Sequence, residues 1–272
     1  MPRRIKLFIC AGIICVLSIT VFFIVRATLE PDKAELWELV YKRKGQNPDR
    51  YTVYIQEDGV YEPYLVIDGD YDGGVLLLRK YLTEEMSPYK ITHPYGKGDY
   101  NGSRGGYYPL SDVDAFLNTD FIEKFPQWFQ DMIRETNILV STSETVRGGS
   151  KNPRETETIQ RKIFLLSVKE VKDEQSRLAA VEGTVLRYFR YRTRLKERIA
   201  TLKDGTAKPH WLRSAYLWND IKAWLVGWNG QIGGGSVSSS YPLRPTFCLS
   251  LNTPIQPEEI DGRKAYVITA VP

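Results

Sequence analysis

The side chains that most often act as nucleophiles or general bases are scarce in this sequence. It has two histidines, His93 and His210, and Cys248 is the one cysteine outside an apolar segment near the N-terminus. The Gly-x-Ser-x-Gly pattern that presents a nucleophilic serine in many hydrolases does not occur. Cys248 lies in the apolar run Phe247-Cys248-Leu249, which is typical of a buried, unreactive thiol. The residue types therefore predict a protein that is not an enzyme.

Metal chemistry has one candidate. Asp68, Asp70 and Asp72 alternate with Gly69, Tyr71 and Gly73, which matches the first half of a calcium-binding loop. Such carboxylates can converge on one cation where the chain curls. However, Arg79 stands at the twelfth position, where such a loop has a bidentate glutamate, and the flanking residues look like strands. We expect an acidic hairpin turn rather than a calcium site, and no other cofactor is predicted.

Aromatic and Gly/Ser-rich residues near the C-terminus are the best candidates for binding a ligand. Trp218, Trp224 and Trp228 precede Asn229, and a Gly/Ser-rich run covers residues 233–240. Aromatic faces stack on sugar rings or accept peptide side chains, and Gly/Ser backbone supplies adaptable hydrogen bonds. Half or more of these tryptophans are nevertheless expected in the core. Trp218-Asn219-Asp220 also matches the calcium-site triplet of C-type lectins, but the sequence has no suitably placed companion triplet.

Two groups of arginines have both a structural and a binding interpretation. Arg187, Arg190, Arg194 and Arg198 follow helical spacing, so they form either a solvated face or a surface for anionic lipids or polyanions. Arg213 and Arg244 each lie among apolar residues, where a buried guanidinium needs carboxylates or carbonyls. For Arg213 and Arg244 we favour a structural role over direct ligand contact, and we keep these two residues as candidates for ligand binding.

Several of these residues belong to motifs that occur in a fixed order. The motifs are Ala115-Phe116-Leu117-Asn118, Phe164-Leu165-Leu166-Ser167 with Glu170, Trp211-Leu212-Arg213-Ser214, and Leu243-Arg244-Pro245-Thr246-Phe247. Together they resemble a bacterial family of domains of unknown function, numbered 6273, over about Tyr64 to Leu251. That family is in turn similar to the C-type-lectin-like fold of the formylglycine-generating enzymes. The resemblance implies this fold, but its oxidase chemistry would need two active-site cysteines, and Cys248 stands alone.

The elements that must position these residues are mainly short strands. Apolar and β-branched runs predict strands over Tyr51–Gln56, Tyr61–Asp68, Val75–Arg79, Ile138–Ser141 and Lys162–Leu166, with further β structure from Trp211 on. Helices are predicted after Ser111, after Pro126, after the capping box Ser167–Glu170, and over residues 185–203. The expected fold class is α+β, a C-type-lectin-like domain.

The N-terminal segment predicts a membrane anchor. Leu7 to Val25 is nineteen residues long and uncharged, so as a helix it would span about 28 Å, close to the hydrocarbon core of a bilayer. A cleaved signal peptide is the alternative, but Arg26 makes Val25-Arg26-Ala27 a poor cleavage site. We expect a tail at residues 1–6, a transmembrane helix at 7–25, a juxtamembrane stalk at 26–50 and the lectin-like domain at 51–272.

The charge distribution sets the orientation and the class of partner. Arg3, Arg4 and Lys6 precede the apolar segment, so the positive-inside rule predicts a cytoplasmic N-terminus and an extracytoplasmic domain. With Arg26 they account for the whole net charge of +4, which leaves no excess of basic residues for nucleic acid. We therefore expect a single-pass membrane protein, a non-catalytic module that binds a glycan or protein at the bacterial cell envelope. The alternatives are a metal-dependent or otherwise unrecognised envelope enzyme, and a scaffold subunit of a membrane complex.

Overall fold

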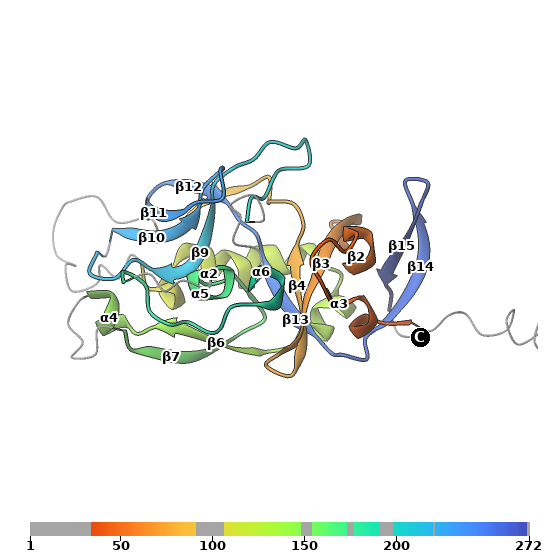
Figure 1. The fold of residues 1–272 in the computed structure, drawn as a ribbon, viewed down its shortest axis with the longest axis horizontal. Coiled ribbons are helices and arrows are strands. Elements are labelled where there is room, and N and C mark those ends of the chain that lie inside the picture. Colours follow the sequence, from red (N-terminus) through yellow and green to blue (C-terminus); the bar gives the residue numbers. More distant parts are fainter. Residues whose placement is uncertain are drawn as a thin grey trace, which may run out of the picture. The chain divides into compact units, whose positions relative to one another are not determined.

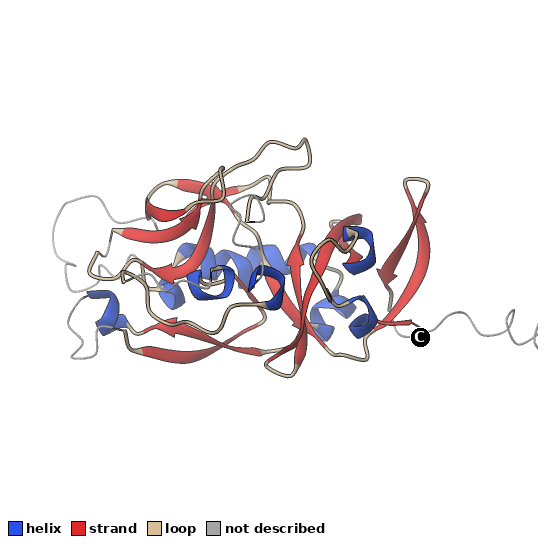
Figure 2. Cartoon of the chain, viewed as in Figure 1, coloured by secondary structure: helices blue, strands red, loops and turns tan. Residues whose placement is uncertain are grey.

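Antiparallel strands form most of the regular structure, with a few short helices between them (Figures 1 and 2). The computed structural model describes residues 34–90, 106–147, 154–172, 177–190, 198–219 and 221–270. From Glu35 onward these residues belong to one compact unit. The predicted α+β class is confirmed at this level.

The largest sheet has eight strands. In spatial order they are β1 (Ala34–Glu35), β14 (Pro254–Ile260), β15 (Arg263–Ile268), β2 (Thr52–Glu57), β3 (Val60–Tyr71), β4 (Gly74–Arg79), β13 (Thr246–Leu249) and β8 (Ile163–Phe164). Every residue of β4 and β13 is buried, which explains why their sequences are apolar on both faces. Strands β15 and β2 pair in parallel, whereas the pairs from β2 to β8 are antiparallel.

Three Asp-Gly pairs make the tight turns of this sheet. Asp58-Gly59, Asp72-Gly73 and Asp261-Gly262 join β2 to β3, β3 to β4 and β14 to β15, and all six residues have positive φ between 49° and 80°. Two successive left-handed residues are the type I′ turn, whose twist matches that of paired strands. The hairpin predicted between the second and third strands is therefore confirmed, with Asp72-Gly73 at its tip.

Three smaller sheets complete the strands. They are β11 (Ile232–Ser236) with β10 (Lys222–Val226) and β9 (His210–Ala215), β12 (Ser240–Pro242) with β5 (Met86–Pro88), and β6 (Thr136–Ser141) with β7 (Thr156–Arg161). Strand β7 was not predicted, because its residues Thr-Glu-Thr-Ile-Gln-Arg are mostly polar and only partly buried. Hydrogen bonding to β6 stabilises β7 as a strand, although its own composition does not favour one.

The helices are short. The α-helices are α2 (Asp112–Phe116), α3 (Gln127–Met132), α4 (Ser143–Arg147), α5 (Val168–Val171) and α6 (Arg187–Arg190). Single turns of other types are η1 (Leu36–Leu39), η2 (Pro48–Tyr51), η3 (Tyr108–Leu110), η4 (Leu117–Phe121) and η5 (Ile122–Lys124). Phe121, Phe125 and Phe129 from this region pack with Phe247 of β13, with neighbouring ring centroids 5.1–5.7 Å apart. This aromatic cluster fixes the predicted helices against the large sheet.

Two boundaries differ from the sequence-based expectation. The helix expected over residues 185–203 is described only as α6, and from Arg198 onward the backbone is a turn with a bridge between Thr201 and Ala207. The stalk expected over 26–50 is part of the compact unit from Glu35 on, where Leu36, Leu39 and Tyr41 are buried. Residues Ala34 to Lys42 have the spacing of a helix in the sequence, and Leu36 and Leu39 lie on the single turn η1.

No helix among the described residues is long and apolar enough to cross a bilayer. The predicted tail and transmembrane helix, residues 1–6 and 7–25, lie outside the described residues.

Candidate functional site

Two exposed tryptophans mark the ends of β10. Trp218 lies in the turn between β9 and β10 and is 54% exposed, and Trp228 lies in the turn between β10 and β11 and is 64% exposed. Ile221 beside Trp218 is also exposed. The five residues of β10 separate these turns by about 13 Å, so a ligand that contacts both turns is expected to be extended.

Backbone hydrogen bonds hold Trp218 in an unusual conformation. Its φ is 60°, in the left-handed region that costs a residue with a side chain about 1–2 kcal/mol. The amide of Asn219 donates to the carbonyl of Tyr216 at 3.2 Å, and the amide of Lys222 donates to the carbonyl of Asn219 at 3.2 Å. The predicted triplet is thus a turn, and its third member, Asp220, lies outside the described residues.

The turn that carries Trp228 is also tightly bonded. The amide of Gly230 donates to the carbonyl of Gly227 at 2.8 Å, and the amide of Gly227 donates to the carbonyl of Gln231 at 2.7 Å. Asn229 accepts a hydrogen bond from the amide of Gln231 through Oδ1 at 3.0 Å. The side chain of Asn229, one of the predicted ligand-binding residues, therefore stabilises its own turn.

Trp224 supports this surface from within instead of facing a ligand. It is 7% exposed, and its Nε1 donates to the carbonyl of Leu178 at 3.0 Å. Its ring stacks on Tyr216 with centroids 4.8 Å apart. Gly234 lies close to the same ring, since a Cβ there would come within 2.7 Å of Tyr216. Trp224 is thus one of the tryptophans expected in the core, because it lies in the middle of β10.

Arg213 is the centre of a buried polar network. Its guanidinium donates to Glu170 through two nitrogens, at 2.7 and 2.8 Å, and to the carbonyls of Leu165 and Leu139 at 2.8 and 3.0 Å. Burial lowers the pKa of Arg213, but the carboxylates of Glu170 and Glu182 reverse this and leave it raised. The geometry supports the structural role that the sequence favoured over ligand contact.

The capping box Ser167–Glu170 is part of the same network and is confirmed. Ser167 Oγ accepts from the amide of Glu170 at 3.2 Å, and Glu170 accepts from the amide of Ser167 at 2.8 Å. Tyr71 of β3 donates its hydroxyl to the same carboxylate at 2.6 Å. Two of the sequence motifs thus meet through one glutamate.

Glu182 is a member of this network that the sequence did not reveal. Its carboxylate accepts from the amide and hydroxyl of Ser141 at 2.8 and 2.6 Å, and from the hydroxyl of Ser214. Burial raises the pKa of Glu182, while Arg213 and the serines oppose the shift. Glu182 is fully buried in an irregular segment, so no helical or strand periodicity in the sequence identifies it as a buried residue. Its neighbour Gly183 has a φ of 99°, which indicates a constrained backbone at this point.

Arg244 lines a small cavity together with His210 and Arg198. All three side chains are buried. Arg198 therefore does not belong to the solvated stripe predicted with Arg187, Arg190 and Arg194; the first two are exposed, and Arg194 lies outside the described residues. His93, likewise, lies outside the described residues.

The predicted calcium loop does not have the geometry of a metal site. Asp72 sits at the tip of the β3–β4 hairpin, where its carboxylate accepts from the amide of Asn137 at 2.7 Å and from the side-chain amide of the same residue at 3.1 Å. Asp68 accepts from the amide of Asp70 at 3.0 Å. Among the described residues no group of three or more acidic, histidine or cysteine side chains could hold a metal ion. The acidic-turn interpretation is the one the structure supports.

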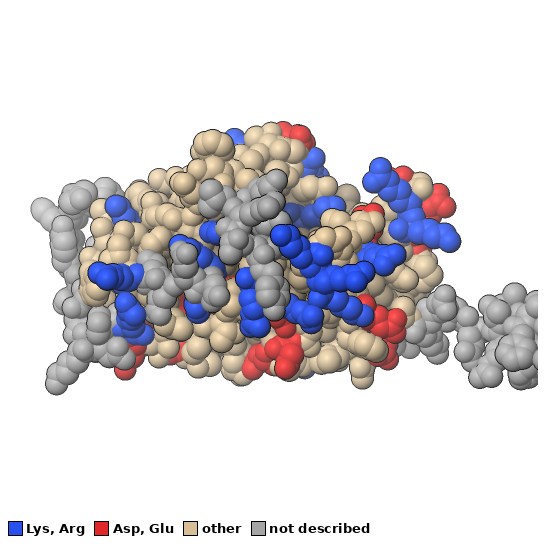
Figure 3. Space-filling model, viewed as in Figure 1, with Lys and Arg blue, Asp and Glu red and all other residues tan. Residues whose placement is uncertain are grey.

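Of the three groups weighed for nucleophilic or acid–base chemistry, Cys248 and His210 are buried, and His93 lies outside the described residues. Burial raises the pKa of the Cys248 thiol to about 12, which keeps it protonated. Burial, and next the charge of Arg244, lower the pKa of His210 to about 3. On the face drawn in Figure 3, basic side chains form a run across the centre and right, with smaller groups of acidic side chains below and beside it.

Comparison with known proteins places most of this structure in one family. No curated protein and no solved structure matches the chain significantly. A family model described as a domain of unknown function, DUF6273, matches residues 72–251. The match includes Arg213, Glu170 and Glu182 of the buried network, the cavity beside Arg244, and the exposed Trp218 and Trp228, whereas Tyr71 lies one residue before it. The chain therefore belongs to the DUF6273 family.

Proposed function

We propose that this protein is a non-catalytic binding module of the bacterial cell envelope, with a C-type-lectin-like domain that takes an extended glycan or protein segment across β10. One observation carries the proposal: Trp218 and Trp228 are exposed on rigid turns at the two ends of one strand. An isolated exposed aromatic residue is common, but two of them on hydrogen-bonded turns form a preorganised surface.

The support beneath this surface favours stacking interactions. Tyr216 and Trp224 stack on each other, and Lys222 lies 5.6 Å from the centre of the Tyr216 ring. Gly234 leaves no side chain on the neighbouring strand above them. The exposed indole faces of Trp218 and Trp228 suit sugar rings or the side chains of a peptide, and each stacking contact contributes about 0.5–1.5 kcal/mol.

Binding is tested with the full chain in detergent micelles. Glycan arrays and pull-downs from envelope extracts supply ligands, and competition with soluble oligosaccharide separates glycans from proteins. The double variant Trp218→Ala/Trp228→Ala should weaken binding at least tenfold, which corresponds to about 1.4 kcal/mol. Its matched control is Trp37→Ala, since Trp37 is 46% exposed but lies on η1. Equal binding by wild type and the double variant would reject this site.

Placement at the envelope rests on the apolar segment Leu7 to Val25 and the basic residues before it. As proposed, residues 7–25 span the bilayer, the N-terminus is cytoplasmic and the domain lies outside. A reporter enzyme that works only outside the cytoplasm, fused after Pro272, should be active. Activity only of a second reporter, one that works in the cytosol, would overturn the proposed topology. It would not by itself test the proposed binding surface.

A further inference from the structure

Arg244 differs from the other buried arginines whose partners are described. Arg79 pairs with Glu57 at 2.9 Å and Glu62 at 3.3 Å, and Arg213 pairs with Glu170 at 2.7 Å. Arg244 is only 8% exposed, yet no carboxylate of the described residues forms an ion pair with it. Its hydrogen bond to the described residues runs from Nε to the carbonyl of Arg79 at 3.0 Å. A buried positive charge without a counterion costs several kcal/mol.

The backbone fixes the direction of this side chain. Leu243 accepts a hydrogen bond from the amide of Thr83 at 3.0 Å and donates to the hydroxyl of the same residue at 2.8 Å. On the other side, Pro245 accepts from the amide of Arg79 at 2.9 Å. Arg244 is thus clamped between two paired residues, and its guanidinium lines the cavity next to β9. The hydrogen bond from its Nε to the carbonyl of Arg79 holds the side chain itself.

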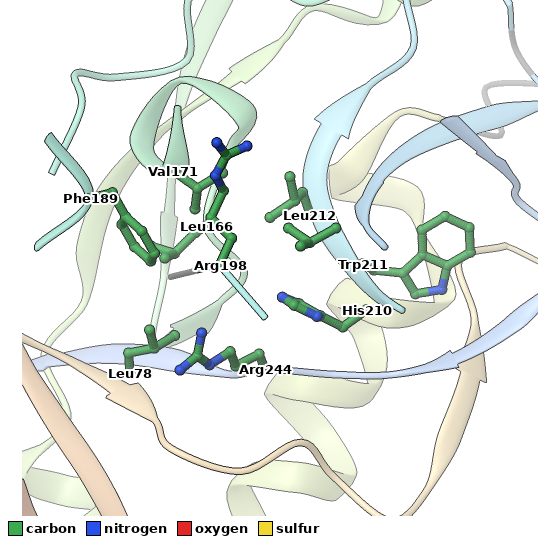
Figure 4. Close-up of a pocket in the computed structure, with 10 residues that line it drawn as sticks. Leu78, Leu166, Val171, Phe189, Arg198, His210, Trp211, Leu212 and Arg244 are labelled. Carbon is green, nitrogen blue, oxygen red and sulfur yellow. The ribbon is translucent and has the colours of Figure 1, made fainter. Parts of the chain in front are cut away.

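The opposite wall of the cavity is also polar. His210, at the start of β9, is 4% exposed, and its Nδ1 has no hydrogen-bond partner among the described residues. Arg198 also lines the cavity, but its guanidinium points away from Arg244 and His210, toward Val171, and Leu78, Leu166 and Phe189 close the cavity with apolar surface (Figure 4). The positive charge of Arg244 helps to keep His210 neutral. The walls therefore carry positive charge and no carboxylate.

The size of the cavity limits its occupant. The cavity has a volume of about 10 Å³, enough for roughly one water molecule. A water molecule could satisfy Nδ1 of His210, but it would leave the charge of Arg244 uncompensated in a medium of low dielectric constant. A halide ion is only slightly larger than water and supplies the missing charge. We propose that Arg244 and His210 form a binding site for one small monovalent anion of about the size of chloride.

The first test measures thermal unfolding of the full chain in detergent micelles. Sodium gluconate, whose anion is too large for the cavity, is replaced stepwise by sodium chloride at constant ionic strength. The Tm of the wild type should rise by about 3–6 °C at ten times the Kd and continue to rise with the logarithm of the chloride concentration. A Tm that does not depend on which anion is present overturns the proposal.

Two variants locate the effect. Arg244→Met should show no chloride-dependent shift, and in gluconate its Tm should equal or exceed that of the wild type, because the uncompensated charge is gone. Arg263→Met removes an exposed arginine on β15 and should keep the full shift. If Arg244→Met still responds to chloride, or is less stable than wild type in both salts, the site is wrong.

A second measurement does not depend on any variant. Wild-type crystals soaked in sodium bromide should give an anomalous scattering peak between Arg244 and His210. Peaks confined to the protein surface would contradict the proposal. Because this site is distinct from Trp218 and Trp228, its failure leaves the proposed ligand surface unaffected.

Discussion

The guanidinium of Arg213 and the carboxylate of Glu170 form a fully buried, two-point ion pair, with nitrogen–oxygen distances of 2.7 and 2.8 Å. This pair joins β9 to the first turn of α5, so two sequence motifs that are more than forty residues apart become one structural unit. We expect it to decide the stability of this half of the domain.

Replacing Arg213 with Met should lower the free energy of unfolding by about 3–5 kcal/mol, because Glu170 is left buried without its partner. Chemical denaturation of the full chain measures this. Arg263→Met at an exposed position serves as the control and should change stability by less than about 0.5 kcal/mol. The double variant Arg213→Met/Glu170→Gln should lose less than the sum of the two single variants, and strict additivity would contradict the pair.

His210 should make stability depend on pH. The folded pKa of about 3 lies below the unfolded value of 6.5, so the unfolded state binds more protons between these limits. This contribution is present above pH 6.5 and is lost as the pH falls toward 3, with a slope of at most about 1.4 kcal/mol per pH unit. Denaturant titrations in chloride-free buffer at pH 7, 6, 5 and 4 should show a steeper loss in wild type than in His210→Gln. Parallel curves would exclude this role.

Trp218→Gly should separate stability from binding. Glycine adopts a φ of 60° without strain, so the free energy of unfolding should rise by about 0.5–1 kcal/mol while the exposed indole is lost. Trp228 does not have a positive φ, and Trp228→Gly should lower stability by a similar amount. Both variants should bind the envelope ligand more weakly. A less stable Trp218→Gly would show that its conformation carries no strain.

Asp72→Ala should destabilise the domain more than Asp261→Ala does. Both residues open type I′ turns, but only Asp72 is bonded to Asn137, at 2.7 Å to its amide. The difference should be about 1–3 kcal/mol, as expected for hydrogen bonds to a charged group. Calcium should leave the Tm of wild type unchanged. A calcium-dependent rise that disappears in Asp72→Ala would restore the rejected metal site.

Local signals in the sequence predicted the local structure well. The spacing of Ser167 and Glu170 defines a capping box, and both of its hydrogen bonds are present. The Asp-Gly pair at Asp72 likewise predicts a hairpin, because few other residues adopt two successive positive φ angles. The helix predicted over 185–203 is present at α6 and absent from Arg198 on, because apolar residues at helical spacing can also serve a turn that packs on a core; residues 191–197 lie outside the described part.

The candidate site depended on information that the sequence does not contain. Trp218, Trp224 and Trp228 have the same residue type and similar neighbours, yet only Trp224 is buried, because it alone lies within β10. The role of Glu182 depends on contacts with Ser141 and Ser214, which are distant in sequence. Residues brought together only by tertiary packing leave no periodic pattern that could identify them.

The parallel pairing of β15 with β2 has a consequence for how the chain folds. Val267 lies beside Tyr54, so this ladder closes a loop that contains most of the domain. Contacts between residues so far apart slow folding, because the entropy of closure is lost before the strands gain their hydrogen bonds. Until β15 arrives, the edge of β2 stays open to pairing with other chains. During synthesis this edge is therefore where aggregation should begin, and where a chaperone would act to most effect.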